Sequence, residues 1–161
     1  MHLQPSKTML GPEHLMSFMK LHGVDGQFIH LNPNEAKTSE SAAKSVGCPI
    51  SQIAKNIVLL GSRPYVLVVS GDKKVDLKKF SRLVSEDVRL AKPDEVLAAT
   101  GYPVGGVPPF GHITQLKTYV DASLTRYDEV ITSGGSDNTL LRVKVKTLLE
   151  IVGGELVDVS K

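Results

Sequence analysis

The chain has 161 residues and a formal net charge of +2, with 41% hydrophobic and 22% charged residues. This composition is typical of an ordinary globular protein. Aromatic residues make up only 5% and tryptophan is missing, which argues against a base-stacking sheet of the kind that single-strand nucleic-acid readers use. Because there is a single cysteine, an internal disulfide and a thiolate zinc cage are both excluded.

The length predicts a loose tail over residues 1–10 and one domain over residues 11–161. No apolar run in the sequence has transmembrane length, and residues 1–5 lack the charged start and apolar core of a signal peptide. We therefore expect a cytoplasmic protein. The mild positive charge permits contact with a nucleic-acid backbone but does not require it.

The first half of the chain alternates helix and strand signals. Pro12 opens a helix that ends at His22, and Thr38 caps a second helix that Gly47 ends. The expected elements are helices over 12–22 and 39–46, a helical turn over 50–54, and strands over 27–31, 55–60 and 65–70. The last two strands are almost continuously apolar and joined by four turn residues, which predicts a buried antiparallel hairpin at the centre of the sheet.

The second half continues the alternation. Asp76 caps a helix over 77–84 that we expect to bury Leu77, Phe80 and Leu83. The remaining expected elements are strands over 88–91, 118–121, 129–132, 141–145 and 155–159, helices over 93–100 and 146–152, and a helical turn near Leu124. Hairpins mixed with helical crossovers predict an α/β protein with a mixed sheet flanked by helices.

The stretch from Gly101 to His112 holds four glycines and three prolines, so neither a helix nor an interior strand can run through it. We expect an ordered loop whose main-chain N–H groups face a carbonyl-bearing or negatively charged ligand. A plain structural crossover is the alternative. Residues 133–138 form a second glycine-containing stretch, which predicts either an anion-binding nest or a tight turn.

Lys55 stands at the start of an apolar strand, on the same face as Ile57 and Leu59. The side chain either reaches solvent past the strand end or stands at the rim of a pocket. In the second case it offers a cation to a phosphate, a carbonyl oxygen or a developing oxyanion. Spacing alone leaves both interpretations open.

The usual enzyme signatures are missing: the sequence has no G-x-S-x-G elbow, phosphate-binding P-loop or H-E-x-x-H. The five histidines never fall at the short spacings of zinc ligands, so we expect no metal site. Cys48 has no basic neighbour in sequence and is interpreted as a small apolar filler. The densest basic cluster is either a solvated helix face or a contact for a phosphate backbone; it consists of Lys73, Lys74, Lys78, Lys79 and Arg82.

Five segments taken in order resemble the YbaK and prolyl-tRNA synthetase editing-domain family of aminoacyl-tRNA deacylases. They are residues 41–47, 52–58, 71–79, 101–111 and 134–138, within a resemblance that runs from about Thr38 to Ile151. The resemblance implies the YbaK-like fold, with a partly barrel-like sheet. It also implies trans-editing: hydrolysis, without a cofactor, of the ester that joins a wrong small amino acid to the terminal adenosine of tRNA.

In that family, cysteine and alanine on tRNA(Pro) are the usual substrates, and prolyl-tRNA synthetase is an expected partner. The functional lysine falls on Lys55, and no protein nucleophile is used: a water, the ribose hydroxyl or the substrate's own thiol attacks the ester. The implied substrate contacts are Gly105, Gly106, Val107, Pro108, Pro109, Gly134, Gly135 and Asn138, with Phe28 or His30 as pocket-lining candidates. If the chain acts on tRNA, the basic cluster of Lys73, Lys74, Lys78, Lys79 and Arg82 is the expected contact for the tRNA backbone.

One departure from the family pattern is Ser136, where many relatives carry another glycine, so we expect a differently shaped pocket floor. Two alternative functions remain open from the sequence. The first is a non-catalytic module that binds the charged 3′ end of tRNA, and the second is a hydrolase of small-molecule esters.

Overall fold

The computed structural model describes residues 9–161, so most of the predicted tail over residues 1–10 lies outside the described residues. Five α-helices, two 3-10 helices and eight strands follow one another along this part of the chain. In order they are α1 (Pro12–His22), β1 (Gln27–His30), α2 (Ser39–Val46), η1 (Ile50–Gln52), β2 (Ile53–Leu60), β3 (Pro64–Ser70), α3 (Leu77–Val84), β4 (Arg89–Leu90), α4 (Pro93–Thr100), β5 (Lys117–Asp121), η2 (Ala122–Arg126), β6 (Glu129–Ser136), β7 (Thr139–Lys144), α5 (Val145–Val152) and β8 (Leu156–Val157).

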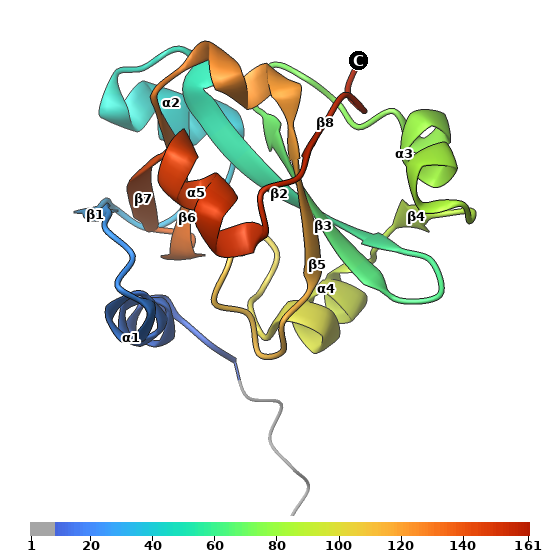
Figure 1. Ribbon diagram of the computed structural model, residues 1–161. Helices are drawn as coiled ribbons and strands as arrows, with labels where there is room; N and C mark the ends of the chain where they lie inside the picture. The colour runs from blue at the N-terminus through green and yellow to red at the C-terminus, as the bar shows by residue number, and fades with distance from the viewer. Residues whose placement is uncertain (1–8) are drawn as a thin grey trace, which may run out of the picture.

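All eight strands belong to one mixed sheet, in the order β1-β7-β6-β2-β3-β5-β8, with β4 paired to β2 outside this path (Figure 1). The hairpin of β2 and β3 is antiparallel over seven residue pairs, from Ala54↔Ser70 to Leu60↔Pro64. On the far side of β3, β5 runs parallel to it, and on the far side of β2, β6 also runs parallel. The predicted central hairpin and mixed sheet are therefore confirmed.

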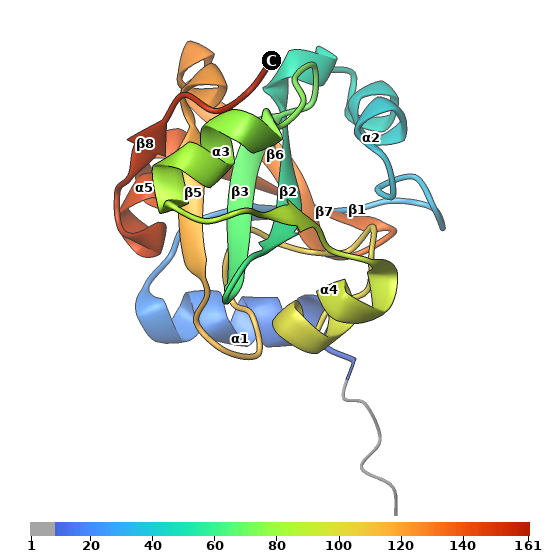
Figure 2. The same cartoon turned by 90° about the vertical axis from the view of Figure 1, so that its right-hand side faces the viewer.

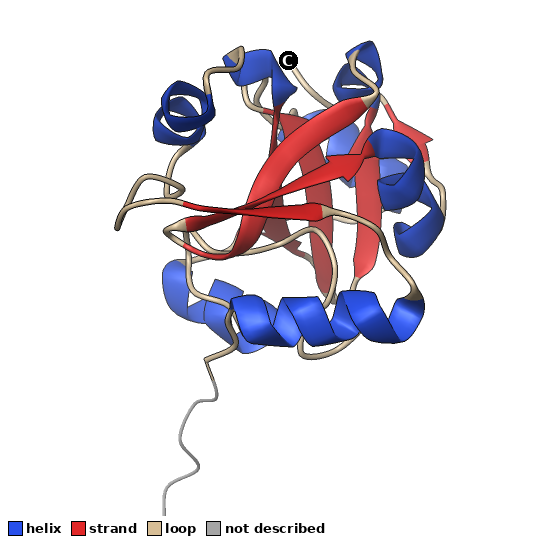
Figure 3. Cartoon of the chain, turned by 90° about the vertical axis from the view of Figure 1, so that its left-hand side faces the viewer, coloured by secondary structure: helices blue, strands red, loops and turns tan. Residues whose placement is uncertain are grey.

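The central strand β3 is buried on both faces because its side chains alternate between two cores. Val66 and Val68 belong to a cluster with α1, α5 and η2, whereas Leu67 and Val69 belong to a cluster that Phe80 of α3 completes. Figure 2 shows α3 lying across β3 and β5, and α1 across one end of the sheet. Figure 3 shows helices on both sides of the strands, which is the flanked sheet that the sequence predicts.

The prediction that Leu83 of α3 faces the core was wrong. Leu77, Phe80 and Val84 contact the core, while the Leu83 side chain is 42% exposed. Positions three and seven residues after Leu77 return to nearly the same direction at 100° per residue, but position six lies roughly 90° away from their mean. Leu83 therefore lies beside the buried face of α3 and not on it.

The second glycine-containing stretch is also different from the prediction of a loop over residues 133–138. β6 continues through Gly134 and Gly135 to Ser136, with an irregularity in its register against β7 between Ser133 and Ser136. Gly135 has φ +107°, which an L side chain rarely adopts, so the extra residues bulge out of the ladder. Only Asp137 and Asn138 remain to make the turn.

The first described residues are held in place. The Leu10 N–H donates to the Gly101 carbonyl (2.7 Å), and the Leu10 side chain packs against the cluster of Val58, Val96 and Tyr102. No helix within residues 9–161 is long and apolar enough to cross a membrane.

Candidate active site

Strand β2 has one continuous neighbour and one divided edge. β3 pairs with it from Ala54 to Leu60, so the other two partners share the opposite edge. There β6 pairs only with Ile53 and Ala54, and β4 only with Leu59 and Leu60. The sheet thus forks, and no strand within residues 9–161 lies beside the middle of this edge of β2.

A pocket of about 320 Å³ occupies the fork. Six consecutive residues of β2, from Ile53 to Val58, line it. Because side chains alternate between faces, six neighbours in a row share a cavity only when it lies against the edge of the strand. The other walls come from α2 and the segment before it, from the end of β4, from the middle of β6, from β7, from α4, and from the loop after α4. Figure 2 shows α2 and α4 at opposite ends of β2, on its forked side.

Lys55 lines this pocket and is only partly buried, so the structure places it at a cavity rather than beyond the strand end. Partial burial lowers the pKa of the Lys55 ammonium from its ordinary value, and the charge of Lys74 acts in the same direction. The carboxylates of Glu40 and Asp72 oppose this shift and raise the pKa. Gly105 and Val107 of the glycine- and proline-rich loop line the same pocket.

A hydrogen-bond relay built on Asn56 ties this loop to the fork. The Asn56 amide donates through Nδ2 to the Val107 carbonyl (2.8 Å) and to Thr132 Oγ1 (2.8 Å), and Thr132 Oγ1 donates to the Ala54 carbonyl (2.7 Å). A carbonyl can only accept, so the contact with Val107 fixes which way the amide points. Asn56 Oδ1 is buried and finds no donor among residues 9–161.

The loop is ordered by contacts with its own residues. The Tyr102 hydroxyl donates to the Gly111 carbonyl (2.9 Å), and a ring nitrogen of His112 lies 2.7 Å from the Pro108 carbonyl. Burial lowers the pKa of His112. Gly105 has φ +87°, and a Cβ atom there meets Lys37 Cγ at 3.0 Å.

The two glycine-rich segments pack main chain against main chain. A Cβ added to Gly106 lies 3.0 Å from Ser136 Cα and 3.2 Å from the Gly135 carbonyl oxygen. A Cβ added to Gly135 would in turn lie 3.0 Å from the main chain of Gly11 and Pro12, at the start of α1. Gly106 and Gly135 therefore support the pocket from behind, because neither lines it.

The pocket wall contains Lys55, the predicted catalytic residue, and two of the residues predicted to bind substrate, Gly105 and Val107. The remaining ones lie elsewhere; they are Gly106, Pro108, Pro109, Gly134, Gly135, Asn138, Phe28 and His30. Phe28 packs against the core, and His30 is exposed on the edge strand β1. Ser136 is also outside the wall, and its hydroxyl donates to Asn138 Oδ1 (2.7 Å) in the turn.

Sequence reasoning missed several wall residues. Lys37 and Thr38 precede α2, Asn56 follows Lys55 in the largely apolar strand β2, and Thr132 lies in β6. A buried polar residue in an apolar strand needs a hydrogen-bond partner, so Asn56 beside Lys55 was the signal available. Its partners come from residues 51 and 76 positions away along the chain, which no local pattern reveals.

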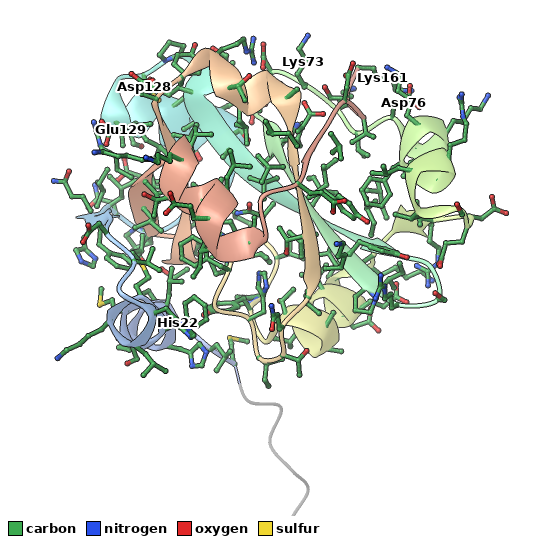
Figure 4. The ribbon with its side chains drawn as sticks, in the orientation of Figure 1. His22, Lys73, Asp76, Asp128, Glu129 and Lys161 are labelled. Atoms are coloured by element: carbon green, nitrogen blue, oxygen red, sulfur yellow. The ribbon has the colours of Figure 1, made fainter. Side chains whose placement is uncertain are left out.

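The predicted basic cluster lies over the loop after β3 and over α3. Lys74, Lys78, Lys79 and Arg82 are exposed, and none of the five pairs with a carboxylate among the described residues. Lys78 and Arg82 line a shallow groove that also contains Glu86 and Asp87. Figure 4 shows Lys73 at the end of the molecule that also carries Asp76 and Lys161, far from His22 of α1.

Among the residues that the structure describes, the pocket wall contains no His, Cys, Asp or Glu, although it contains the hydroxyls of Thr38, Ser39, Thr132 and Ser133. A hydroxyl needs an adjacent base to become a nucleophile. Among residues 9–161, no group of three or more potential metal ligands gathers. What this wall offers to a reaction is therefore cationic and main-chain polar groups.

The sequence profile of the aminoacyl-tRNA editing domain matches residues 33–151. This chain belongs to the aminoacyl-tRNA editing domain family. It is accordingly a hydrolase of the ester bond in aminoacyl-tRNA, and the family resemblance found in the sequence is confirmed.

Individual relatives agree with this assignment. An uncharacterized protein of Bacillus subtilis, YwhH, is 35% identical over 77% of this chain and 81% of its own length. EbsC of Enterococcus faecalis, whose name marks it as a candidate deacylase of Cys-tRNA(Pro) and Cys-tRNA(Cys), is 28% identical over 76% of this chain and 77% of its own. A proline–tRNA ligase of Solidesulfovibrio magneticus is 34% identical over 66% of this chain but only 19% of the ligase.

The fold of this editing domain has solved counterparts. A crystal structure described as that of a candidate trans-editing enzyme for prolyl-tRNA synthetase superposes with a TM-score of 0.87, at 35% identity over 99% of both chains. Residues 12–30, which form α1 and β1, lie outside the matched family profile, yet α1 contacts the bulge at Gly135.

Proposed function

We propose that this editing enzyme removes a small wrong amino acid, cysteine or alanine, from tRNA(Pro) in the cytoplasm, as a free-standing partner of prolyl-tRNA synthetase. Three similarities support this substrate: the name of EbsC, the match to a segment of proline–tRNA ligase, and the structural neighbour described as a trans-editing enzyme. The observation that carries the mechanism is the wall composition, which combines Lys55 with the partly exposed main chain of Gly105 and, among the described residues, contains no carboxylate, imidazole or thiol.

The pocket size favours a small amino acid. The apolar part of the wall next to α2 is formed by Ala36, Ala42, Ile53 and Leu140, which belong to one hydrophobic cluster. A cavity of about 320 Å³ that also receives part of a ribose leaves room for only a few side-chain atoms. One methylene changes binding by only about 1–3 kcal/mol, so cysteine and alanine are expected to differ modestly.

In the proposed reaction, a water oxygen, the neighbouring ribose hydroxyl or the substrate thiol adds to the ester carbonyl carbon. The carbonyl oxygen becomes an oxyanion, which the Lys55 ammonium stabilises. The bond between the carbonyl carbon and the ribose oxygen then breaks, and the ribose oxygen takes up a proton. The proton that the nucleophile loses balances the one that the ribose oxygen takes up. With water as nucleophile, the products are the free amino acid and tRNA with a free 3′ end. Attack by the substrate thiol releases the amino acid as a cyclic thioester, and attack by the ribose hydroxyl only moves the acyl group to that oxygen, so in the latter case water must still hydrolyse the ester. Catalysis depends on positioning and electrostatics.

The test is release of radiolabelled amino acid from Ala-tRNA(Pro), Cys-tRNA(Pro) and Pro-tRNA(Pro). We expect Lys55→Ala to slow release by about 10²–10³-fold while leaving the fold intact. Lys37→Ala is the comparison, because Lys37 is the other lysine of the wall. An unchanged rate for Lys55→Ala would remove Lys55 from the mechanism. Binding of tRNA without release of any amino acid would support the 3′-end binding module instead.

The basic cluster of Lys73, Lys74, Lys78, Lys79 and Arg82 is proposed to contact the tRNA backbone. Lys74 is close enough to Lys55 to lower its pKa, which connects the cluster to the pocket mouth. The 3′ end of a tRNA that carries the acyl group into the pocket would therefore pass the positive charges of this cluster.

A further inference from the structure

The open part of the β2 edge is a single residue long. The Gly71 N–H donates to the Ile53 carbonyl (2.7 Å), so the main chain of Ile53 faces the hairpin partner β3. In an antiparallel pair, the main-chain N–H and carbonyl groups of successive residues point alternately toward and away from the partner strand. The main-chain groups of Lys55 and Ile57 therefore also face β3. Ala54, Asn56 and Val58 face the fork.

Two of these three residues already have partners. Ala54 pairs with β6 through Thr132, and the Val58 carbonyl accepts from the Ala91 N–H (3.0 Å). Within residues 9–161, neither β6 nor β4 pairs with Asn56, and no turn or loop hydrogen bond reaches its main-chain N–H or carbonyl. In proteins, nearly all main-chain N–H and carbonyl groups that are shielded from water have a hydrogen-bond partner. From Ala54 to Val58 the edge is about 13 Å long at roughly 3.3 Å per residue, which is room for a ligand.

We propose that the aminoacyl group of the substrate completes the sheet at Asn56 as a one-residue β-bridge. In an antiparallel hydrogen-bonded pair, two residues exchange both N–H···O bonds. An aminoacyl ester carries the same two groups one carbon apart: an α-ammonium and a carbonyl oxygen. The α-ammonium donates to the Asn56 carbonyl, and the Asn56 N–H donates to the ester carbonyl oxygen.

This inference rests on the proposed function and specifies how the site recognises an α-amino acid. Recognition by main-chain groups is independent of the amino acid's side chain. Selection among side chains therefore depends on their contacts with the residues of the pocket wall. It also makes the Asn56 N–H a fixed donor to the oxygen that becomes negative during hydrolysis. The relay from Asn56 Nδ2 to Val107 and Thr132 holds this part of the strand in place.

The first test measures hydrogen exchange of individual amides by NMR. In the free protein, we expect the Asn56 amide to exchange at least 100-fold faster than the amides of Lys55 and Ile57, which face β3. Addition of the alanyl amide of 3′-amino-3′-deoxyadenosine, which cannot be hydrolysed as an ester, should slow exchange at Asn56. An Asn56 amide that is equally protected without ligand, or that stays unprotected when the ligand is bound, overturns the proposal.

The second test compares that alanyl amide with the matching propionyl amide, which differs only by the loss of the α-amino group. We expect the propionyl compound to bind roughly 10- to 100-fold more weakly, because it leaves the Asn56 carbonyl without a charged donor. Equal affinity of the two compounds would contradict the β-bridge. Release of alanine from Ala-tRNA(Pro) is measured in the same preparation. An active enzyme with equal affinities refutes only the β-bridge, whereas an inactive one that still prefers the alanyl compound refutes only the proposed function.

Discussion

Asn56 and Thr132 share a hydrogen bond of 2.8 Å at the point where β6 separates from β2. Through this bond, the carbonyl of Val107 in the loop is connected to the carbonyl of Ala54 in the sheet. Thr132 is only 1% exposed, so water does not compete for its hydroxyl. The pocket floor is therefore a polar relay enclosed by an apolar core.

Thr132→Val keeps the shape of the side chain but removes the hydroxyl from the relay. We expect the free energy of unfolding to fall by about 1–3 kcal/mol, because Asn56 and Ala54 each lose a buried partner. Thr132→Ser retains the hydroxyl and serves as the control, with a smaller loss from the missing methyl group. Urea denaturation of both variants measures the difference. Equal stabilities of the valine variant and the wild type would show that the relay contributes nothing.

Much of the fold follows from local signals in the sequence. Thr38 and Asp76 cap α2 and α3 as predicted, with their side chains accepting from Ser41 N–H and Lys79 N–H. The nearly continuous apolar runs predicted the central hairpin because only a strand covered on both faces tolerates them. The end of β6 was missed because Gly134 and Gly135 favour turns locally, whereas pairing with β7 holds them in a bulged strand.

The pocket was only partly predictable for a related reason. Lys55 was found because a lysine on an apolar strand face is locally unusual. Whether it reaches solvent or a cavity depends on β4 and β6 diverging from the same edge of β2, which is a property of the sheet topology. Lys37 is part of the wall and lies against Gly105, which is 68 positions later in the chain. Sequence spacing does not reveal a contact of this kind.

Gly106→Ala should displace the loop without changing any group of the pocket wall. The added Cβ lies 3.0 Å from the main chain at Ser136, which cannot rotate away as a side chain does. We expect a loss of about 1–3 kcal/mol in the free energy of unfolding. Because Gly105 and Val107 move with the loop, we also expect a decrease of about 10- to 100-fold in deacylation.

Gly23→Ala is the matched control for this loss of stability. Gly23 has φ +64° at the end of α1, and an added Cβ has no atom within 4 Å. The strained backbone costs roughly 1–2 kcal/mol without moving the pocket loop. If both variants lose activity equally at a temperature where both are folded, the role of Gly106 in positioning the loop is refuted.

The pH dependence of deacylation should report the Lys55 ammonium. Its pKa is lowered from the ordinary value, chiefly by burial, so the charged form and the activity it supports are lost at a lower pH than for an exposed lysine. Activity is expected to be retained below that pKa and to fall as the pH rises through it. The uncatalysed hydrolysis of the ester, measured in parallel, is subtracted at each pH.

Replacing two neighbours of Lys55 should move the high-pH limb of the pH–activity profile, where activity falls, in opposite directions. Glu40→Gln removes a carboxylate that raises the pKa of Lys55, so the limb shifts to lower pH. Lys74→Ala removes a like charge that lowers the pKa, so the limb shifts to higher pH. A limb that moves in the same direction in both variants, or remains when Lys55 is replaced, does not belong to the Lys55 ammonium.

Neutralising the basic cluster should weaken binding of tRNA without changing the chemical step. A Lys78→Ala and Lys79→Ala double variant is expected to raise KM for Ala-tRNA(Pro) while kcat stays near the wild-type value, because both side chains are exposed and outside the pocket wall. The slope of log affinity against log salt should decrease by about one for each phosphate contact that is lost. Filter binding over a range of salt concentrations measures this slope.

Lys20→Ala is the control for this change of charge. Lys20 is exposed on α1, whose end at His22 lies far from Lys73 in Figure 4. A specific contact predicts that KM and the salt slope change in the double variant but not in Lys20→Ala. If Lys20→Ala has half the effect of the double variant, the attraction comes from net charge alone, and the cluster on α3 has no particular place on the tRNA.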